Sequence, residues 1–598
     1  MSNEKFDFAF AIGGAAGQGI ATPGDILARL LVRRGLHVST YNAFQSIVRG
    51  GHIFLTVRAS DRPIGSHGDK IDLLLCLNQD TMDRHLQLLG PGAAALYNSD
   101  AITPGDAAAG VQLCGLPVSE LTGGGRNPLN QNTVAIGAMM YMLGLDFKLL
   151  EESLTKQFER KGQAMVDENV GVARAGYEHA EKNFVRFQFE MPSGPKPLAM
   201  WSGNEALGMG GAAAGVKFYA AYPMSPSTGV LHWMAQNARH LGIMVRQVED
   251  EIAVANMVIG AAHAGTRAMC ATSGGGFALM TEAIGMAGMM EIPVVFINVQ
   301  RAGPSTGVPT KTEQGDLWQA LGASQGDFER LIVAPRDALD AFNTMPELFN
   351  LAEKYQVPGI VLSDLYISEG RFSVDTDEID LLPKIERGDY ITEASANGNG
   401  KGDYKRYAYT ESGISTRAMP GLEGYVHVVA TDEHDEDSML ISDEFTNPHK
   451  RRKMVEKRAR KLSTVLDNIA PPALEGPADA DVTLLSWGSN HGIIKDALEL
   501  LEERGVKANQ LSIKWLVPFH GEEVMKILSN AKKVLIVENN YSGQFYRYMR
   551  SETGLSVDGH IRKYDGEPFM PHHIADGVVE HLGGKAQGTF VPYQEVIA

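Results

Sequence analysis

Short apolar runs alternate with longer amphipathic stretches along most of the chain. Near the start, FDFAFAI runs into a glycine-rich turn and a helical pattern, and the β-like runs HIFLTVRA and KIDLLLCL follow. The alternation returns with GIMVRQVE, TRAMCAT and IPVVFINV, and again with DVTLLSWGS and KVLIVENN. Strand and helix signals that alternate in this way predict α/β domains built on parallel sheets with crossover helices.

Changes in composition divide the 598 residues into four segments. Proline and glycine accumulate at MPSGPKPLAM, which sets the end of a first α/β unit near residue 195. A second α/β unit covers residues 196–383 and a third covers residues 476–598. The segment between them, 384–475, is a connecting region of loop-like and highly charged sequence.

The connecting segment contains an acidic run, TDEHDED, and a basic run, HKRRKMVEKRARK. The acidic run places His434 among carboxylates, but its consecutive ligands do not match the spacing of a metal-binding loop. We therefore expect a solvated loop there. For the basic run we expect a helix whose charges lie on a solvated face.

Charge and cysteine content exclude several classes of function. A net charge of −18 disfavours nucleic acid and anionic membrane surfaces as partners. No apolar run is long enough to span a membrane, and the acidic start MSNEKFDFAF does not match a signal peptide. Cys76, Cys114 and Cys270 lie too far apart to hold a four-cysteine cluster or to suggest a disulfide framework, which favours a reducing, cytoplasmic compartment.

The first strand leads into a candidate phosphate loop, GGAAGQG. Its candidate residues are Gly13, Gly14, Gly17, Gln18 and Gly19. Glycines let a ligand approach the backbone, and a helix N-terminus favours a phosphate. The spacing differs from the dinucleotide fingerprint and no acidic residue follows at the distance a ribose requires, so a nicotinamide site is not favoured. NAFQSIVRGGH, with Arg49, is a second candidate ligand loop, or else a simple turn at a strand entry.

The central unit carries candidate residues at the ends of its predicted strands. In FYAAYPMSPSTGV, Pro223 and Pro226 stiffen a turn and hold Ser225 where ligands bind in open α/β sheets. In RQVEDEIAVAN, three acids at residues 249–251 stand at a strand-to-helix junction, where capping and the helix dipole alone would also select acids.

Two further strand ends complete this set. ATSGGGF places Ser273 and Gly274 in a tight turn after a strand. Arg301 follows the apolar strand IPVVFINV, where its guanidinium could clamp a carboxylate with two hydrogen bonds. The alternative, a surface salt bridge, is less attractive beside so apolar a strand.

Several motifs together resemble a known family. GNEALGMGGAAAGVKFYAAYPMSPST, EDEIAVANMVIGAAHAGTRAMCATSGGGF and QRAGPSTGVPTKTEQGDLWQAL resemble the alpha subunit of 2-oxoacid:ferredoxin oxidoreductases. GGAAGQG with SIVRGGH is similar to that family's gamma domain, and KWLVPF, VENNYSGQ and KYDGEPF resemble its transketolase-C-like domain. The resemblance covers nearly the whole chain. It implies a gamma-type domain, a thiamine-diphosphate-binding (pyrimidine) domain and a transketolase-C-like domain, in that order.

The resemblance implies an enzyme that decarboxylates a 2-oxoacid on thiamine diphosphate, forms an acyl-CoA and passes electrons through an iron–sulfur cluster to ferredoxin. The magnesium–diphosphate signature GDG of thiamine enzymes does not occur in the sequence, and neither do cluster cysteines. Magnesium and the cluster are therefore expected on a beta subunit, in a dimer of alpha/beta heterodimers. The gamma-type glycine loop is expected to contribute to the CoA site.

The resemblance also implies roles for single residues. Glu251 aligns with the glutamate that activates the pyrimidine ring of thiamine, and such a residue is expected to be buried. Ser225 stands where pyruvate-using relatives present a threonine to the substrate, and Arg301 aligns with the arginine that holds the substrate carboxylate. Pro223, Ser273 and Gly274 are expected beside the cofactor.

The 2-oxoglutarate members of the family are the most similar, through GxPTKTEQGDL. A dicarboxylate would need a second cation, for which Lys311 is a candidate and an ordinary surface lysine is the alternative. Pyruvate and branched-chain 2-oxoacids remain open, as does the direction of the reaction. A non-redox thiamine enzyme of transketolase type and a nucleotide-binding scaffold subunit are the two rival classes.

Overall fold

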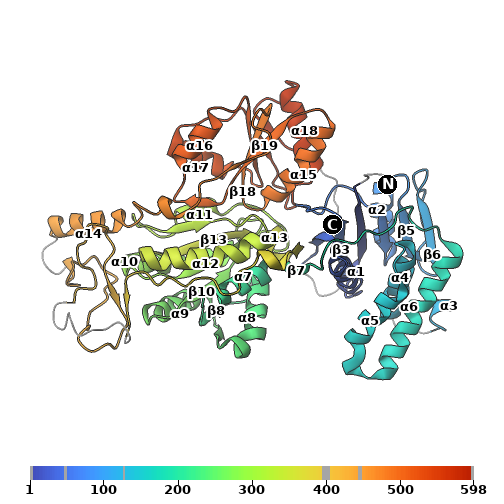
Figure 1. The fold of residues 1–598 in the computed structure, drawn as a ribbon, viewed down its shortest axis with the longest axis horizontal. Helices are drawn as coiled ribbons and strands as arrows, with labels where there is room; N and C mark the ends of the chain where they lie inside the picture. Colours follow the sequence, from blue (N-terminus) through green and yellow to red (C-terminus); the bar gives the residue numbers. More distant parts are fainter. Residues whose placement is uncertain (1–4, 46–49, 125–127, 393–403, 442–446, 594–598) are drawn as a thin grey trace.

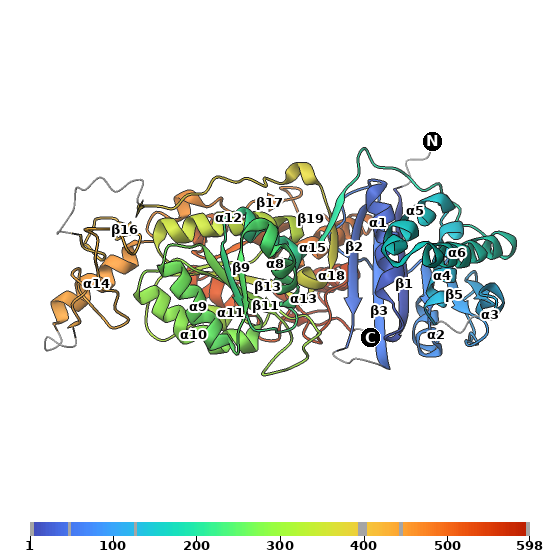
Figure 2. The same ribbon diagram turned by 90° about the horizontal axis from the view of Figure 1, so that it is seen from below.

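The computed structural model of the chain describes residues 5–45, 50–124, 128–392, 404–441 and 447–593. The chain forms three α/β bodies and a projecting arm, and the third body packs on the central one (Figure 1). The first body and the arm lie at opposite ends of the molecule, with the central body between them (Figures 1 and 2). Among the described residues, no helix has the length and apolar character needed to cross a membrane.

The first body is built on an eight-stranded mixed sheet. In order across the sheet, its strands are β6 (Gln112–Leu116), β5 (Ala94–Asn98), β4 (Leu73–Cys76), β1 (Asp7–Ala16), β3 (Gly50–Ser60), β2 (His37–Ala43), β14 (Arg371–Val374) and β7 (Ala199–Ser202). Its main helices are α1 (Ala21–Arg33), α2 (Gln79–His85), α4 (Pro128–Met142), α5 (Phe147–Phe158) and α6 (Gln163–Asn183).

A parallel sheet was predicted for this body, and only part of the sheet is parallel. The strands β1, β4, β5 and β6 are parallel, whereas β3 pairs antiparallel with both β1 and β2. The reason is the short connection from β2 to β3, because a parallel crossover needs a dozen or more residues.

The central body contains a seven-stranded sheet in which all pairs but one are parallel. Its strands, in order, are β20 (Trp515–Val517), β12 (Leu331–Val333), β13 (Gly359–Asp364), β11 (Val295–Gln300), β10 (Ala268–Thr272), β8 (Phe218–Ala221) and β9 (Met244–Gln247). Helices cover both faces: α9 (Glu251–His263) and α10 (Gly274–Met289) pack on one, and α7 (Gly203–Ala213), α8 (Thr228–Leu241) and α12 (Ala338–Tyr355) on the other.

The two faces follow from strand periodicity. Cys270 of β10 belongs to the core under α9 and α10, while its neighbours Met269 and Ala271 belong to the core under α7, α8 and α12. Successive side chains of a strand point to opposite faces, so a strand covered on both sides is apolar throughout. This explains why the central strands read as continuous apolar runs.

The third body holds a six-stranded sheet with strands β17 (Leu474–Glu475), β19 (Ala508–Ile513), β18 (Val482–Trp487), β21 (Val534–Glu538), β22 (Gly559–Arg562) and β23 (Thr589–Phe590). Its helices are α15 (Asn490–Glu503), α16 (Gly521–Leu528), α17 (Gln544–Thr553) and α18 (Pro571–Leu582). Strands cross between the bodies: β7 and β14 join the first sheet, and β20 joins the central one.

The arm comes from the connecting segment and contains β15 (Tyr390–Ile391), β16 (Arg417–Ala418) and α14 (Pro448–Arg460). The basic run forms α14, as expected, but its charges are not all solvated. The side chains of Lys457 and Lys461 are 0% and 2% exposed, and both lie within 2.7 Å of the buried carboxylate of Glu291. Burial alone would raise the pKa of Glu291, but the two lysines outweigh it and hold that pKa well below its usual range.

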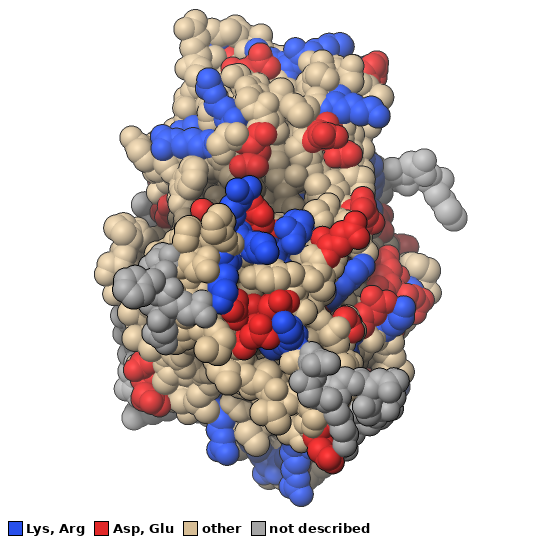
Figure 3. All heavy atoms as spheres, turned by 90° about the vertical axis from the view of Figure 1, so that its left-hand side faces the viewer, with Lys and Arg blue, Asp and Glu red and all other residues tan. Residues whose placement is uncertain are grey.

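The expected solvated loop at TDEHDED is also wrong. His434 is fully buried, and Glu433 forms an ion pair with Arg458 of α14 at 2.8 Å. Figure 3 looks onto this end of the molecule, where basic and acidic side chains lie beside one another. The two charged runs therefore neutralise each other and hold the arm together.

Candidate active site

The predicted residues of the central body meet at one edge of its sheet. Ser225 follows β8, the glutamate Glu251 follows β9, Gly274 follows β10 and Arg301 follows β11. Because these four strands are parallel, their carboxyl ends lie together, which is where open α/β sheets bind ligands.

The three acids at the start of α9 have different roles. Asp250 is the N-cap, and its side chain accepts a hydrogen bond of 2.8 Å from the backbone N–H of Ala253. Glu249 is exposed, whereas Glu251 is only 3% exposed. Within the described part of the chain, the Glu251 Oε1 atom has no hydrogen-bond partner. Capping therefore accounts for Asp250 but not for the buried, unpaired Glu251.

The glycines that open α10 let this helix approach two acidic side chains. A Cβ atom on Gly276 would lie 2.5 Å from Glu251 Oε1, and one on Gly274 would lie 2.6 Å from the Oδ2 atom of Asp316. The hydroxyl of Ser273, at the N-cap of α10, is buried and has no partner among the described residues. The turn thus packs closely against the carboxylates of Glu251 and Asp316, and it leaves the Ser273 hydroxyl without a partner among the described residues.

Arg301 and Ser225 are in direct contact. The Arg301 Nη1 atom donates a 2.6 Å hydrogen bond to the backbone carbonyl of Ser225, while the Arg301 Nε atom is buried without a partner among the described residues. Burial lowers the pKa of Arg301, and the nearby Asp316 opposes that shift. Pro223 is exposed in the same strand-end loop. A buried guanidinium N–H without an acceptor is costly, so this side chain is prepared for an anionic ligand.

Of the predicted residues, Arg301 and Gly274 border a cavity of about 740 Å³ at the junction of the central and third bodies, whereas Ser225, Glu251 and Ser273 are not among its lining residues. Arg301, Gly274 and Met224 line one side, and the third body contributes the loop from Asn540 to Gln544. That loop is fixed to the central body, because the Gln544 amide donates a 2.7 Å hydrogen bond to the carbonyl of Gly315.

The same cavity contains two carboxyl groups that sequence reasoning missed. Burial and the nearby carboxylate of Asp316 raise the pKa of Glu313 to about 7. Burial raises the pKa of Asp316 to about 6, against the opposing effects of Asn298 and Arg301. Both acids lie in the run TKTEQGD, where their spacing of three residues was the available signal.

Lys311 lies elsewhere. Its ammonium group forms an ion pair with Glu567 of the third body, and the Tyr41 hydroxyl of the first body donates a hydrogen bond to the same carboxylate. Lys311 is not among the residues that line the cavity. The cluster of Lys311, Glu567 and Tyr41 therefore ties the three bodies together.

In the first body, the structure corrects the placement of two candidate glycines. Gly13 and Gly14 lie inside β1 rather than in the turn, and a Cβ atom on Gly13 would clash with Thr81 of α2. Gly17 and Gly19 do form the turn, with φ angles of +91° and +74° that favour glycine. Backbone conformation therefore explains the glycines at positions 17 and 19, whereas close packing against α2 explains Gly13.

The side chain of Gln18 closes the same turn by accepting a 2.6 Å hydrogen bond from the backbone N–H of Ala15. The predicted ligand residue Arg49 lies outside the described residues.

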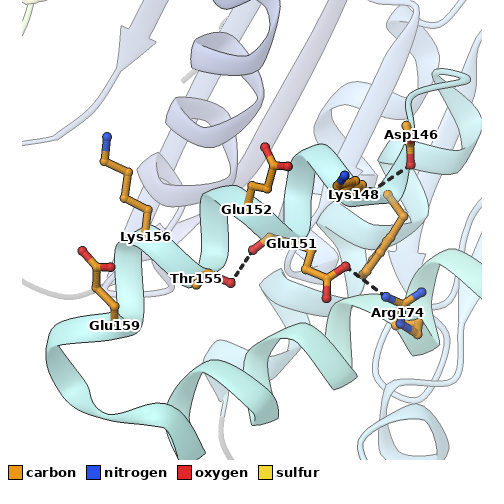
Figure 4. A pocket seen from close by; sticks show the side chains of 9 residues that line it. Asp146, Lys148, Glu151, Glu152, Thr155, Lys156, Glu159 and Arg174 are labelled. Carbon is orange, nitrogen blue, oxygen red and sulfur yellow. Dashed lines mark hydrogen bonds and ion pairs between the residues drawn. The ribbon is translucent and has the colours of Figure 1, made fainter.

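A hollow of about 790 Å³ lies on the first body, between α5 and α6 (Figure 4). One ion pair crosses it, the 3.2 Å contact between Arg174 of α6 and Glu151 of α5. None of the predicted site residues lines it.

Comparisons with known proteins identify the family of the chain. Three family models match in sequence order: pyruvate ferredoxin/flavodoxin oxidoreductase at residues 9–179, the thiamine-diphosphate-binding domain of pyruvate flavodoxin/ferredoxin oxidoreductase at 210–457, and core domain II of pyruvate:ferredoxin oxidoreductase at 480–574.

Relatives match over most of the chain. The alpha subunit of 2-oxoacid:ferredoxin oxidoreductase 2 from Aeropyrum pernix is 31% identical over 96% of this chain and 97% of its own. The 2-oxoglutarate synthase subunit KorA from Methanothermobacter thermautotrophicus is 33% identical over 63% of this chain and 97% of its own.

A solved structure, the 2-oxoglutarate:ferredoxin oxidoreductase from Magnetococcus marinus with 2-oxoglutarate, coenzyme A and succinyl-CoA bound, superposes with a TM-score of 0.89. It is 32% identical, and the match covers 97% of this chain and 100% of that one. The chain therefore belongs to the 2-oxoacid:ferredoxin oxidoreductases, as the alpha subunit of a multi-subunit enzyme.

Proposed function

We propose that this chain oxidatively decarboxylates 2-oxoglutarate to succinyl-CoA, or catalyses the reverse carboxylation, with electrons exchanged with ferredoxin. The observation that carries the proposal is the buried Glu251 carboxylate, whose Oε1 atom lacks a partner among the described residues and faces the glycine turn of α10. The preference for 2-oxoglutarate follows the Magnetococcus marinus enzyme, which binds that acid, and the 2-oxoglutarate synthase relatives.

The residues at this sheet edge fit thiamine diphosphate. Glu251 would hold the aminopyrimidine ring, because an unpaired buried carboxylate oxygen needs a hydrogen-bond donor. Ser273 and Gly274, at the start of α10, would lie beside the cofactor. When bound, thiamine diphosphate supplies a carbanion and an electron sink at its thiazolium ring. Glu251 would share a proton with the pyrimidine ring nitrogen and would so set the protonation state of that ring.

Arg301 and Ser225 would bind the substrate head, which is the carboxylate next to the keto group. The guanidinium fork matches a planar carboxylate with two parallel hydrogen bonds, and this fixes the direction of the neighbouring keto group. The Ser225 backbone already orients Arg301 through its carbonyl, and the Ser225 hydroxyl would add a hydrogen bond to the same carboxylate.

The turn at Gly17, Gln18 and Gly19 would contribute to the CoA site, together with Arg49. The support is a glycine turn with positive φ angles directly before the N-terminus of α1, a place that suits a phosphate. In this proposal the first body presents CoA to the cavity where Arg301 holds the 2-oxoacid.

The partners follow from the same proposal. A beta subunit would hold magnesium and the iron–sulfur cluster, and the complete enzyme would be a dimer of alpha/beta heterodimers that reduces ferredoxin in the cytoplasm. Cys76, Cys114 and Cys270 of this chain are buried and unpaired, and burial raises the pKa of each thiol, which suits a packing role rather than a cluster.

The proposal is tested with Arg301→Ala, Arg301→Lys and Ser225→Ala in the complex with the beta subunit. Charge-assisted hydrogen bonds are worth about 1.5–3 kcal/mol, so Arg301→Ala should lower kcat/KM for both pyruvate and 2-oxoglutarate by about 10- to 100-fold and more than Ser225→Ala. Arg301→Lys should remain impaired because it loses the fork. A loss confined to 2-oxoglutarate would place Arg301 at the distal carboxylate instead.

A further inference from the structure

The residues that line the cavity carry too little positive charge to neutralise a substrate with two carboxylates. Among the described residues that line it, Arg301 is the only cation, and Glu313 and Asp316 are both acids. The lysine expected to be the second cation, Lys311, is held in its ion pair with Glu567. A 2-oxoacid with a second carboxylate must therefore meet something other than a lysine or arginine of these lining residues.

The two acids differ in how firmly they are held. Asp316 accepts a 3.0 Å hydrogen bond from the amide of Asn298, and its backbone N–H donates one of 3.0 Å to Gln300. It also lies against Gly274. Glu313 accepts a hydrogen bond from the backbone of Gly303. Hydrogen bonds and close packing thus hold Asp316 in place near Arg301, whereas the Glu313 carboxyl group is available to contact a ligand in the cavity.

We propose that Glu313 is a specificity-determining residue which, in its neutral form, donates a hydrogen bond to the distal carboxylate of a dicarboxylic 2-oxoacid whose other carboxylate is held by Arg301. This inference rests on the proposed function and assigns a residue to the second carboxylate of its substrate. A protonated carboxyl group has one O–H donor, which an ionised one lacks. The cavity would thereby accept a second negative charge without a second cation.

The environment of Glu313 supports the neutral form near neutral pH. Burial and the carboxylate of Asp316 together raise the pKa of this group to about 7. A bound carboxylate would act in the same direction, because a like charge disfavours ionisation. As the pH rises through that pKa, the neutral fraction of Glu313 falls, so binding of the dicarboxylate should weaken above pH 7 and stay strong below it.

Other groups around the cavity also titrate or carry charge. Arg301 carries a positive charge throughout, Tyr541 contributes a phenol hydroxyl, and the pKa of Asp316 is about 6. Asp316 stands beside Arg301, which holds the head that monocarboxylic and dicarboxylic acids share. Its titration therefore affects both kinds of substrate, and the ratio between the KM values for the two kinds isolates the contribution of Glu313.

The test compares 2-oxoglutarate with 2-oxobutyrate in the complete complex with the beta subunit, between pH 6 and pH 8. With a pKa of about 7, the ratio between the KM for 2-oxoglutarate and the KM for 2-oxobutyrate should rise about tenfold over this range. In Glu313→Gln, which keeps a donor but cannot ionise, the ratio should stay constant. The matched control is Glu502→Gln, on an exposed position of α15, which should behave as the wild type.

A second readout is proton uptake on binding of oxalylglycine, a dicarboxylate that is not decarboxylated, measured by calorimetry in buffers of different ionisation enthalpy. The wild-type complex should take up a fraction of a proton at pH 7.5, and Glu313→Gln should take up clearly less, because only Asp316 then remains as a titrating acid of the described cavity lining. A constant KM ratio in the wild type, or a pH-dependent one in Glu313→Gln, would overturn the inference. If the complex turned over neither 2-oxoglutarate nor 2-oxobutyrate, that result would overturn the proposed function as well.

Discussion

At the scale of single residues, the three acids at the start of α9 differ in burial: Glu251 is 3% exposed, whereas Glu249 is exposed and Asp250 caps the helix. Strand-end position pointed to Arg301 and to these three acids as a group, because ligands bind at the carboxyl ends of parallel strands. Sequence could not separate Glu251 from its two acidic neighbours without the family alignment, since only the structure shows which one is buried.

The acids Glu313 and Asp316 escaped prediction for a physical reason. A carboxyl group is recognised as functional by its raised pKa, and this depends on burial that a local sequence does not reveal. Lys311 shows the opposite case: its position in the motif suggested a substrate contact, whereas its partner Glu567 is 256 residues away in the sequence.

The first prediction concerns Glu251→Gln. Glutamine keeps the shape but cannot share a proton, so turnover of the complex should fall about 10²- to 10⁴-fold, the usual range for an acid–base group. Thiamine diphosphate binding, followed by calorimetry, should weaken much less. Turnover close to wild type would remove Glu251 from the mechanism and make Glu249 the candidate.

At the scale of elements, the α/β alternation predicted three sheets correctly, while strand direction in the first sheet was missed. Periodicity identifies a strand but not its direction, which depends on the length of the connection. The basic run of α14 was recognised as a helix, yet two of its residues, Lys457 and Arg458, are buried because they meet acids far away in the sequence.

The start of α10 gives a prediction with a matched control. In Gly276→Ala the new methyl group would clash with Thr272 Oγ1 and would lie 2.5 Å from Glu251 Oε1, so both side chains must move and turnover should fall about tenfold or more. In Gly260→Ala, at an exposed position of α9, no atom lies within 4 Å of the new methyl group, so activity should persist and the helix should gain about 0.5–1 kcal/mol. Equal losses in both variants would show that a glycine-to-alanine change in these helices, rather than the contact with Glu251, lowers turnover.

The buried ion pair that anchors α14 gives a further prediction. Lys457→Ala leaves the buried Glu291 with one lysine fewer, and removing one partner of a buried ion pair costs about 3–5 kcal/mol. Amide hydrogen exchange in α14 should then accelerate about 100-fold or more. Arg452→Ala removes an exposed pair with Glu456 and should change exchange little. Unchanged exchange in Lys457→Ala would mean that the arm is held by other contacts.

At the scale of the whole molecule, the order of the domains was readable from sequence, but their interlocking was not. The strand β14 leaves the central segment to extend the first sheet, and β20 leaves the third segment to extend the central one. The cavity itself is shared, because Arg301 comes from the central body and the loop at Asn540 from the third. Such contacts join residues hundreds of positions apart, and no local pattern specifies them.

The central claim is that this chain completes a thiamine-dependent redox site only together with its partner. Visible spectroscopy tests it most directly. The chain alone should be colourless, and its complex with the beta subunit should show the broad absorbance of an iron–sulfur cluster that 2-oxoglutarate and CoA bleach. The Glu251→Gln complex should be equally coloured but should not bleach. A cluster in the isolated chain, or bleaching that is unchanged in Glu251→Gln, would contradict the account.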